Sequence, residues 1–438
     1  MDARFSILQC LPADDRLVLI QDGREVRAGE LRTRAAKLES DIAKHAWRRV
    51  ALVSGRADTL VAALAGVQQS RCDLLLLRED YPPEDPVWAA WQAEALLDDD
   101  LQVRRTFASS PPEATGSILL TTSGTTGKPK VAVHSIEVLA SRAMETKSRA
   151  EGSRWLLTFH PASFAGLQVI LTVVVGGSEL IALAHPNMTN LVQAAHEGRP
   201  THISATPTFW RSLLVAVSAT EHGLPLQQIT IGGEAVDQST LNQLRRAYPQ
   251  ARLAHIYAST EAGALFAVRD GQAGFPAAWL ESSVSGTRLR IRDGVLEILS
   301  PREMRGYVGD SAPKNRTDDG WLVSGDLVEV TGDRVLFKGR TDNVINVGGA
   351  KVMPEEVENV LLQHEAVREA RVFGQRNPLV GAVVCAEIVL ASGFDEQTAR
   401  ASIFSHAARH MEQHKLPRLL RFVPSIPTNA AGKKVRQS

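Results

Sequence analysis

Short apolar runs alternate with segments of helical periodicity in the first part of the chain. The runs lie at residues 17–20, 50–53 and 73–77, and apolar residues recur at helical spacing through 29–46 and 58–69. The runs predict buried strands, and the periodic segments predict helices that bury one face. A parallel sheet with helices packed on it is the expected result, and the pattern resumes over residues 117–231.

The pattern changes after about residue 286, where short predicted strands follow one another closely. Turns that contain glycine or aspartate separate them, which is typical of a small, mainly antiparallel sheet or barrel. The predicted strands are residues 289–291, 295–299, 322–323, 327–330 and 335–337.

A last segment, from about Asp342 on, combines strands and helices in the manner of a compact α+β domain. The predicted helices are residues 354–363 and 395–410, and predicted strands lie at 370–374 and 383–390. We therefore expect the α/β class with two domains. Residues 1–341 would form a large N-terminal domain of parallel-rich α/β layers plus a small β-rich subdomain, and residues 342–438 a small C-terminal domain.

Composition and charge argue against several classes of protein. The 438 residues are 44% hydrophobic and 22% charged, as in ordinary globular proteins. Lys and Arg number 49, as do Asp and Glu, so the net charge is zero. It does not indicate binding to nucleic acid or to an anionic membrane. Cys10, Cys72 and Cys385 lie too far apart for a disulfide framework or a CxxC metal site, which fits a reducing cytosol.

The sequence contains no recognisable export or membrane segment. Its start lacks a basic stretch followed by a long apolar one. The most apolar stretch, residues 164–175, is interrupted by Gln168 and Thr172 and is too short to span a bilayer. It predicts a buried helix, and we expect a cytoplasmic protein without a membrane or nucleic-acid partner.

A loop rich in glycine, hydroxyl groups and lysine follows the predicted strand at residues 118–120. Residues 123–130 read SGTTGKPK. Glycines let backbone N–H groups approach an anion, hydroxyls donate to phosphate oxygens, and lysines neutralise them. The spacing does not fit a Walker A loop, because Gly124 and Gly127 are too close together. The two lysines directly after a buried strand favour phosphate binding over a flexible surface loop.

Residues 123–130 also resemble the signature loop of AMP-forming acyl- and aryl-CoA synthetases, luciferases and nonribosomal peptide synthetase adenylation domains. Four further motifs follow in the order of that family, so the resemblance spans roughly residues 118–436, although the first hundred residues look shortened. The resemblance implies ATP, Mg²⁺ and a thiol acceptor. The implied nucleotide-binding residues of the loop are Ser123, Gly124, Thr125, Thr126, Gly127 and Lys128.

The second motif, residues 257–261 (YASTE), resembles the family's Tyr-Gly-x-Thr-Glu. By this resemblance Tyr257 stacks on adenine, Thr260 contacts the α-phosphate, and Glu261 binds Mg²⁺. Upstream, residues 231–234 resemble the strand and loop that line the nucleotide and acyl pockets. That segment supplies Gly232 to the acyl pocket and Gly233 and Glu234 to the nucleotide.

The remaining motifs resemble the family's ribose site, hinge and catalytic lysine. Asp326, in residues 320–327 (GWLVSGDL), would accept hydrogen bonds from both ribose hydroxyls. Arg340 would contact the ribose, and Asp342 would be the hinge of a mobile C-terminal domain. Gly348 and Gly349 would form the loop that enters the site in the thiol step. Lys433, in residues 427–436, takes the place of the catalytic lysine, with Thr260 and Glu261 as the other catalytic groups.

Several positions depart from the family pattern. Ala258 replaces a glycine, His255 an asparagine, Leu322 an aromatic residue and Ser324 a threonine, and Asn346 often a lysine. None of these changes removes a group that adenylation requires.

The implied reaction has two steps, activation of a carboxylic acid to an acyl-adenylate and transfer to a thiol. Amino-acid-activating members carry Ser-Phe-Asp where this chain has Ser163, Phe164 and Ala165. Without that aspartate an α-ammonium group would be buried unpaired, so an aryl or aliphatic acid is expected. His160 is either a further pocket residue or an ordinary histidine at a strand end.

Three functions remain open. The first is a carboxylic acid–CoA ligase, and the second is a free-standing adenylation enzyme that loads the phosphopantetheine of an acyl carrier protein. The third is a nucleotide-binding homologue without catalysis. Glu261, Asp326, Arg340 and Lys433 together argue against the third.

Overall fold

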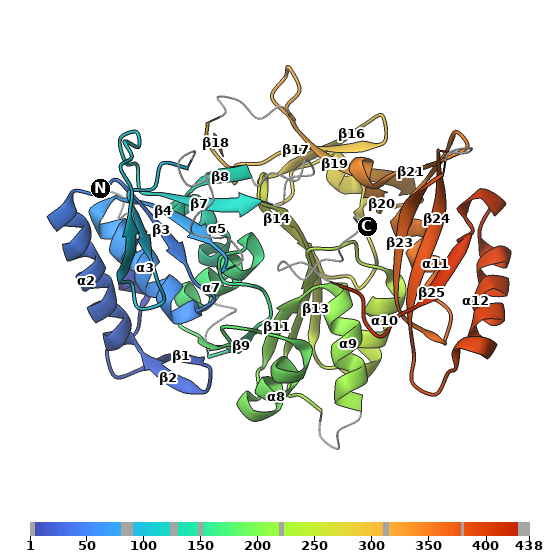
Figure 1. The fold of residues 1–438 in the computed structure, drawn as a ribbon, viewed down its shortest axis with the longest axis horizontal. Coiled ribbons are helices and arrows are strands. Elements are labelled where there is room, and N and C mark those ends of the chain that lie inside the picture. Colours follow the sequence, from blue (N-terminus) through green and yellow to red (C-terminus); the bar gives the residue numbers. More distant parts are fainter. Residues whose placement is uncertain are drawn as a thin grey trace.

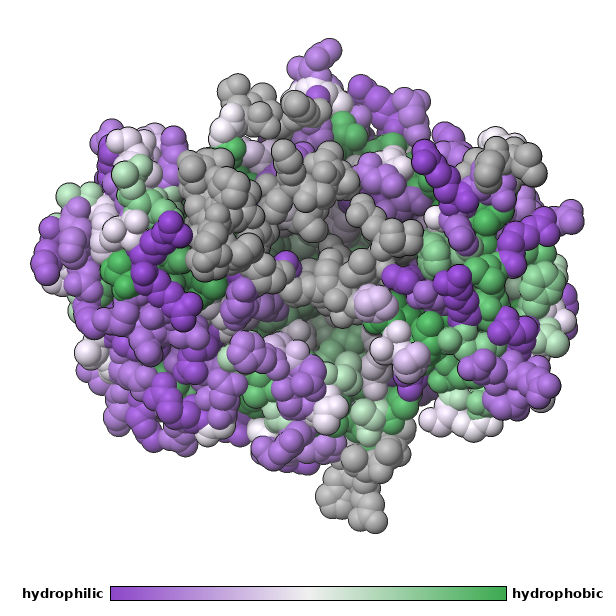
Figure 2. Space-filling model, in the orientation of Figure 1, coloured by the Kyte–Doolittle hydropathy of each residue, from purple (hydrophilic) through white to green (hydrophobic). Residues whose placement is uncertain are grey.

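A computed structural model describes residues 5–79, 91–122, 130–147, 152–218, 223–309, 315–377 and 381–427. A large N-terminal α/β body carries the C-terminal domain at one side (Figure 1). Figure 2 shows hydrophilic residues over most of one face, and apolar residues gather mainly over the C-terminal domain. No helix among the described residues is long and apolar enough to cross a membrane.

The first large sheet has the strand order β14-β13-β12-β11-β9-β10-β1-β2. Its strands are β1 (Leu17–Gln21), β2 (Arg24–Arg27), β9 (Arg154–Leu157), β10 (Glu179–Ala182), β11 (His202–Ala205), β12 (Gln228–Gly232), β13 (Arg252–Ser259) and β14 (Gly263–Val268). The strands β1 and β9 to β13 pair in parallel, whereas β2 and β14 are antiparallel at the two edges. The predicted parallel sheet is therefore confirmed, with two antiparallel edge strands added.

The second large sheet has the order β18-β8-β7-β4-β3-β5-β6. Its strands are β3 (Arg49–Val53), β4 (Asp73–Leu77), β5 (Ala95–Leu97), β6 (Val103–Thr106), β7 (Ser117–Thr122), β8 (Lys130–Ser135) and β18 (Gly306–Tyr307). The strands β5, β3, β4 and β7 are parallel, and β8 turns back antiparallel to β7. The loop at residues 123–129 connects β7 to β8 and lies outside the described residues.

Helices pack between and around these sheets. They are α1 (Ile7–Cys10), α2 (Ala28–His45), α3 (Ala57–Ser70), α5 (Ile136–Glu145), α7 (Phe164–Gly176), α8 (Met188–Gly198), α9 (Pro207–Ser218) and α10 (Gln238–Ala247). One core cluster joins Leu74 and Leu120 of the second sheet to Leu180 of the first through the buried faces of α3 and α7. On the other face of the first sheet, α8, α9 and α10 form a separate core around Trp210.

The helix α7 confirms the buried helix that the apolar stretch predicts. Ser163 caps its start, since its Oγ accepts a hydrogen bond from the backbone N–H of Gly166 at 3.1 Å. Gly177 ends it with φ of 64°, a conformation that favours glycine. Because the helix lies between two sheets, it needs no polar face.

The small antiparallel sheet has the order β15-β20-β19-β17-β16. Its strands are β15 (Phe275–Pro276), β16 (Arg288–Arg292), β17 (Val295–Leu299), β19 (Leu322–Thr331) and β20 (Arg334–Arg340), and the short helix η1 (Ala277–Leu280) follows β15. The two strands predicted at 322–323 and 327–330 are wrong as separate elements, since both belong to β19. Gly325, with φ of 76°, and a register shift at Leu327 interrupt the apolar pattern without ending the strand.

The C-terminal domain follows the expected α+β pattern. Its strands are β21 (Ile345–Val347), β22 (Ala350–Val352), β23 (Val367–Asn377), β24 (Gly381–Leu390) and β25 (Leu419–Phe422), and its helices are α11 (Pro354–Leu361), α12 (Glu396–His410) and η3 (Gln413–Lys415). The sheet and both α-helices enclose a core of their own. The short helix η2 (Thr341–Asn343) joins this domain to β20. The boundary at 341/342 stays a prediction.

Candidate active site

The carboxyl ends of four neighbouring parallel strands bring the expected site residues to one edge of the first sheet. The strands β9, β11, β12 and β13 are adjacent in that sheet. His160 follows β9, Glu234 follows β12, and Thr260 and Glu261 follow β13. Ligands bind at this edge in open α/β sheets, because the loops there leave the strands in one direction.

Asp326 lies at the centre of a polar cluster on this side of the small sheet. The register of the hairpin formed by β19 and β20 places it opposite Arg340, whose Nη1 donates to its Oδ1 at 2.8 Å. The hydroxyl of Tyr257 donates to the other carboxylate oxygen, Oδ2. The Asp326 side chain is only 16% exposed, so this carboxylate is held in a fixed orientation. Three residues predicted separately to bind the nucleoside thus lie together.

Tyr257 remains a neutral hydrogen-bond donor in this cluster. Burial, and then the charge of Asp326, raise the pKa of Tyr257 well above its usual value. Its ring packs against Phe337 and Phe266, with centroids 4.9 and 5.4 Å apart. A carboxylate has about four acceptor positions. The Asp326 carboxylate suits the two hydroxyls of a ribose, because a carboxylate can accept several hydrogen bonds at once, and it lies beside a flat aromatic side chain.

Glu261 makes a polar contact with Tyr307 that the sequence motifs do not predict. The Tyr307 hydroxyl donates to Glu261 Oε1 at 2.9 Å, and burial, together with the Glu261 charge, raises the pKa of Tyr307. The backbone N–H of Met304 donates to the Glu261 carbonyl at 2.9 Å. Lys130 Nζ lies 5.3 Å from the centre of the Tyr307 ring. No motif in the sequence singled out Tyr307.

The donor set fits a magnesium ion that is shared with a phosphate. Within the described ranges, no group of three or more His, Cys, Asp or Glu side chains could hold a metal by itself. Glu261 offers one carboxylate beside Thr260, which is predicted to contact the α-phosphate. Mg²⁺ is commonly bound by one or two carboxylates together with substrate phosphates and waters, so a single glutamate suits it.

Glu234 and its glycines form a turn at the end of β12. The Thr208 hydroxyl donates to Glu234 Oε2 at 2.8 Å, which fixes the carboxylate over the start of α9. Gly233 has φ of 84°, a conformation that side chains disfavour. An added Cβ at Gly232 would lie 3.2 Å from the Ile256 carbonyl, so only a glycine fits easily there.

His160 is held by hydrogen bonds at both ring nitrogens. Its Nδ1 accepts from the backbone N–H of Ala162 at 3.1 Å, so its Nε2 carries the proton and donates to Glu79 at 2.9 Å. Burial opposes ionisation of Glu79, but the hydrogen bond from His160, a backbone hydrogen bond and the nearby histidines together outweigh it and lower the pKa of Glu79. Glu79 follows β4 of the second sheet, and no sequence motif pairs it with His160. The pair links the two large sheets.

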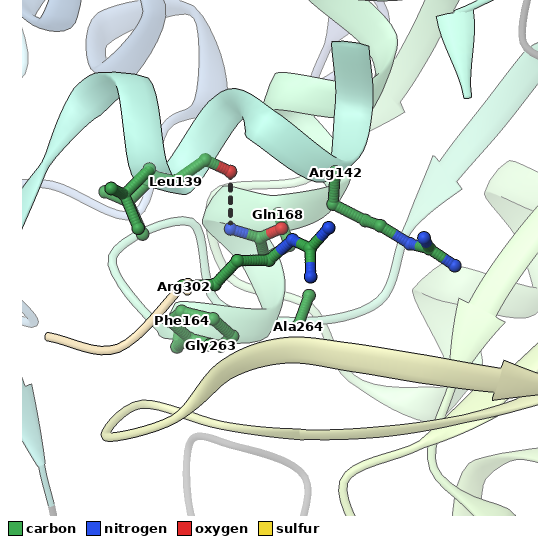
Figure 3. Close-up of a pocket in the computed structure, with 8 residues that line it drawn as sticks. Leu139, Arg142, Phe164, Gln168, Gly263, Ala264 and Arg302 are labelled. Carbon is green, nitrogen blue, oxygen red and sulfur yellow. Dashed lines mark hydrogen bonds between the residues drawn. The ribbon is translucent and has the colours of Figure 1, made fainter. Parts of the chain in front are cut away.

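Phe164 and Ala165 occupy the first turn of α7 and are partly buried. The Phe164 ring lies 5.9 Å from the ring of His134, and it lines a pocket with Gln168 and Ala264 (Figure 3). Phe164 thus lines this pocket, and its role in binding the acyl group stays a prediction.

Other predicted residues lie elsewhere or outside the described ranges. Gly348 and Gly349 form the exposed turn between β21 and β22, with φ of 57° and 90°, and Asp342 lies in η2. The phosphate loop, Ser123 to Lys128, and the predicted catalytic Lys433 lie outside the described residues. Their roles stay predictions.

Comparisons with known proteins agree with the motifs. A family model described as AMP-binding enzyme matches residues 22–308, and one described as AMP-binding enzyme C-terminal domain matches residues 356–433. The chain is 30% identical over 345 residues to 4-coumarate–CoA ligase-like 4 of Oryza sativa subsp. japonica, an alignment that covers 73% of this chain and 61% of that relative.

Two further proteins extend the comparison. A probable 2-succinylbenzoate–CoA ligase of Mycobacterium tuberculosis (strain CDC 1551 / Oshkosh) is 30% identical over 328 residues, which is 72% of this chain and 82% of that one. A crystal structure of an anthranilate CoA ligase in complex with anthranoyl-AMP covers 98% of this chain and 95% of its own, with a TM-score of 0.82 at 19% identity, and shares the fold. The resemblance of the sequence motifs is thus confirmed, and the chain belongs to the family of AMP-binding enzymes that form acyl-adenylates.

Proposed function

We propose that this protein is an AMP-forming acid–thiol ligase that activates a carboxylic acid with ATP and transfers the acyl group to CoA. The observation that carries the proposal is the cluster of Tyr257, Arg340 and Asp326 beside Glu261 at the carboxyl edge of the first sheet. The relatives at 30% identity are named as CoA ligases, which supports the same reaction.

In the first step, a carboxylate oxygen of the acid attacks the α-phosphorus of ATP. The new P–O bond forms as the bond to pyrophosphate breaks, and pyrophosphate leaves with its electron pair. Tyr257 and Asp326 hold the nucleoside, and Thr260 contacts the α-phosphate. Glu261 would hold Mg²⁺, which neutralises phosphate charge when bound. Lys433 and the loop at residues 123–130 add positive charge where negative charge builds up.

In the second step, a thiolate attacks the acyl carbonyl and AMP leaves. Gly348 and Gly349 are exposed at the tip of a turn, as is suitable for a segment that enters the site from the C-terminal domain. Rotation of the C-terminal domain about Asp342 would withdraw Lys433 from the active site and bring this turn into it. A carrier-protein phosphopantetheine ends in the same thiol as CoA and is the second candidate acceptor.

The acid is aryl or aliphatic. Ala165 supplies no carboxylate for an α-ammonium group, and Phe164 presents an aromatic ring at the pocket. His160 has both ring nitrogens occupied, so it orients the wall of the site and does not transfer protons.

The test is ATP–pyrophosphate exchange over a panel of acids, followed by addition of CoA or a carrier protein. Exchange with an aryl or aliphatic acid and thioester formation with free CoA are the expected results. Exchange only with α-amino acids would contradict the substrate class, and thioester formation only on a carrier protein would favour the second acceptor. Failure of exchange with every acid would contradict the proposed reaction.

A further inference from the structure

The pocket beside Phe164 combines apolar walls with two arginines, which is unusual for a site that binds only a hydrocarbon. Apolar side chains of Leu139, Phe164 and Ala264 line it together with Gln168, Arg142 and Arg302 (Figure 3). Figure 3 shows the Arg302 side chain lying across this pocket between Gln168 and Ala264.

This pocket adjoins the proposed reaction centre through two chain segments. Ala264 is near the start of β14, three residues after Glu261. Arg302 begins the segment that leads to Tyr307, and that segment contacts Glu261 twice, through the Met304 backbone and the Tyr307 hydroxyl. An acid whose carboxylate lies near Glu261 can therefore extend its other end toward Arg302.

The two arginines share one carboxylate. Arg302 Nη2 donates to Glu145 Oε1, and Arg142 Nη1 donates to Glu145 Oε2 at 2.7 Å. The two guanidinium groups also donate to neutral oxygens of Ser285. Arg142 donates to its hydroxyl and Arg302 to its carbonyl. Among the described residues, two positive charges thus share one negative charge, and Arg142, at 21% exposed, also meets water. The Arg302 side chain is 8% exposed, so it is shielded from water, which would otherwise stabilise its charge.

A buried polar atom without a partner lies at the same place. Within the described part of the chain, Arg302 Nε has no hydrogen-bond partner, although the Arg302 side chain is only 8% exposed. A buried donor or acceptor without a partner destabilises the structure, and a ligand that pairs with it recovers part of that loss.

We propose that this pocket receives the far end of the acid substrate, and that this far end carries a second carboxylate, which Arg302 binds. The proposal rests on the proposed function and narrows its substrate class to dicarboxylic acids. A carboxylate would neutralise the excess charge and accept a charge-assisted hydrogen bond from the guanidinium. The pocket is closed around its side chains in this structure, so the proposal requires the partly buried Phe164 side chain to move when the acid binds.

A purely structural role for Arg302 gives a different expectation. Its contacts to Glu145 and Ser285 tie the segment before Tyr307 to α5 and to the turn that precedes β16. If that were its whole role, substituting Arg302 would change stability and overall rate without changing the preference between acids.

The experiment compares pairs of acids that differ only at the far end, a carboxylate against a carboxamide. One series is aliphatic and the other is built on phenylpropanoate, and kcat/KM for ATP–pyrophosphate exchange is measured for each acid. The wild type should prefer the terminal carboxylate at least about tenfold in one series. Arg302→Met should reduce this preference to about parity while the carboxamide is still activated, and Arg302→Lys should restore part of it.

Arg305→Met is the matched control, because Arg305 lies on the same segment and does not line the pocket. It should keep the wild-type preference. Ala264→Asp leaves the contacts of Arg302 to Glu145 intact and should also abolish the preference, by placing a like charge in the pocket. It serves as the second test if Arg302→Met fails to fold.

Two results would overturn the inference. One is a wild-type preference for the carboxamide in both series, and the other is an equal loss for both acids in Arg302→Met. ATP–pyrophosphate exchange only with acids that lack a second carboxylate would contradict this inference but leave the proposed function standing. Absence of exchange with every acid would contradict both.

Discussion

Replacing Asp326 by asparagine tests the nucleoside site most directly. The carboxylate accepts from Arg340 through Oδ1 and from Tyr257 through Oδ2, and in the proposed function it also accepts from the ribose hydroxyls. An asparagine keeps the shape but has one oxygen, and its amide nitrogen can only donate. With that oxygen turned toward Arg340, one ribose hydroxyl loses its acceptor.

The size of the effect follows from the charge of the lost acceptor. A hydrogen bond to a charged group contributes roughly 1.5–3 kcal/mol, so ATP binding should weaken by about 2 kcal/mol, or roughly thirtyfold. Because the ribose does not react, the contact should be equally strong in the ground state and the transition state. The KM for ATP should therefore rise while kcat changes little.

The assay is calorimetric titration with ATP and with 2′-deoxy-ATP, on the wild type and on Asp326→Asn. The wild type should bind ATP more tightly than the deoxynucleotide, and the variant should lose most of that difference. Asp318→Asn, on the exposed turn before β19, is the control and should bind both as the wild type does. If Asp326→Asn weakens the two nucleotides equally, its carboxylate does not receive the 2′-hydroxyl and the argument fails.

Four other substitutions or conditions test the remaining assignments. Glu261→Gln should raise the Mg²⁺ concentration for half-maximal adenylate formation, since an amide is a poorer ligand, and an unchanged titration would remove Glu261 from the metal site. Lys433→Ala should nearly abolish adenylate formation but spare thioester formation from preformed acyl-adenylate, and equal losses would contradict its role. Asp342→Pro should keep ATP–pyrophosphate exchange but slow thiol transfer at least about tenfold in single-turnover kinetics, because proline fixes φ; wild-type rates in both steps would refute the hinge. Burial lowers the pKa of His134 from 6.5 to about 4 and that of His202 likewise, so the free energy of unfolding should fall as pH decreases through this range, by about 1.4 kcal/mol per unit for each histidine. Urea unfolding of His134→Asn should show a flatter pH dependence, and an unchanged slope would contradict this assignment.

Much of the fold could be predicted, because the chain carries clear periodicity. The stretch at residues 164–175 differs from α7 by one residue at its end, since a helix between two sheets is apolar all round. The strand β19 was split into two because Gly325 breaks the apolar pattern, while the ladder to β20 continues on both sides of it. The local sequence pattern does not show that hydrogen bonds to a neighbouring strand continue β19 across this interruption.

The nucleoside site could be predicted from motifs, but its partners from other segments could not. Asp326 and Arg340 were assigned separately, and a hairpin register joins them. The contact between Glu79 and His160 joins residues from different sheets, and Tyr307 reaches Glu261 only because β18 pairs with β8. Such contacts depend on how whole layers pack, and no short sequence pattern encodes that packing.

The strand β20 has a consequence for how the two half-reactions are kept in order. Its last residue, Arg340, contacts the carboxylate that would bind the ribose, and η2, which contains the proposed pivot, begins at the next residue. A ligand in the nucleoside site can thus affect Asp342 across the two peptide bonds that separate it from Arg340, without passing through the core. A ligase built in this way would sense whether AMP is still bound at the very point where its C-terminal domain turns.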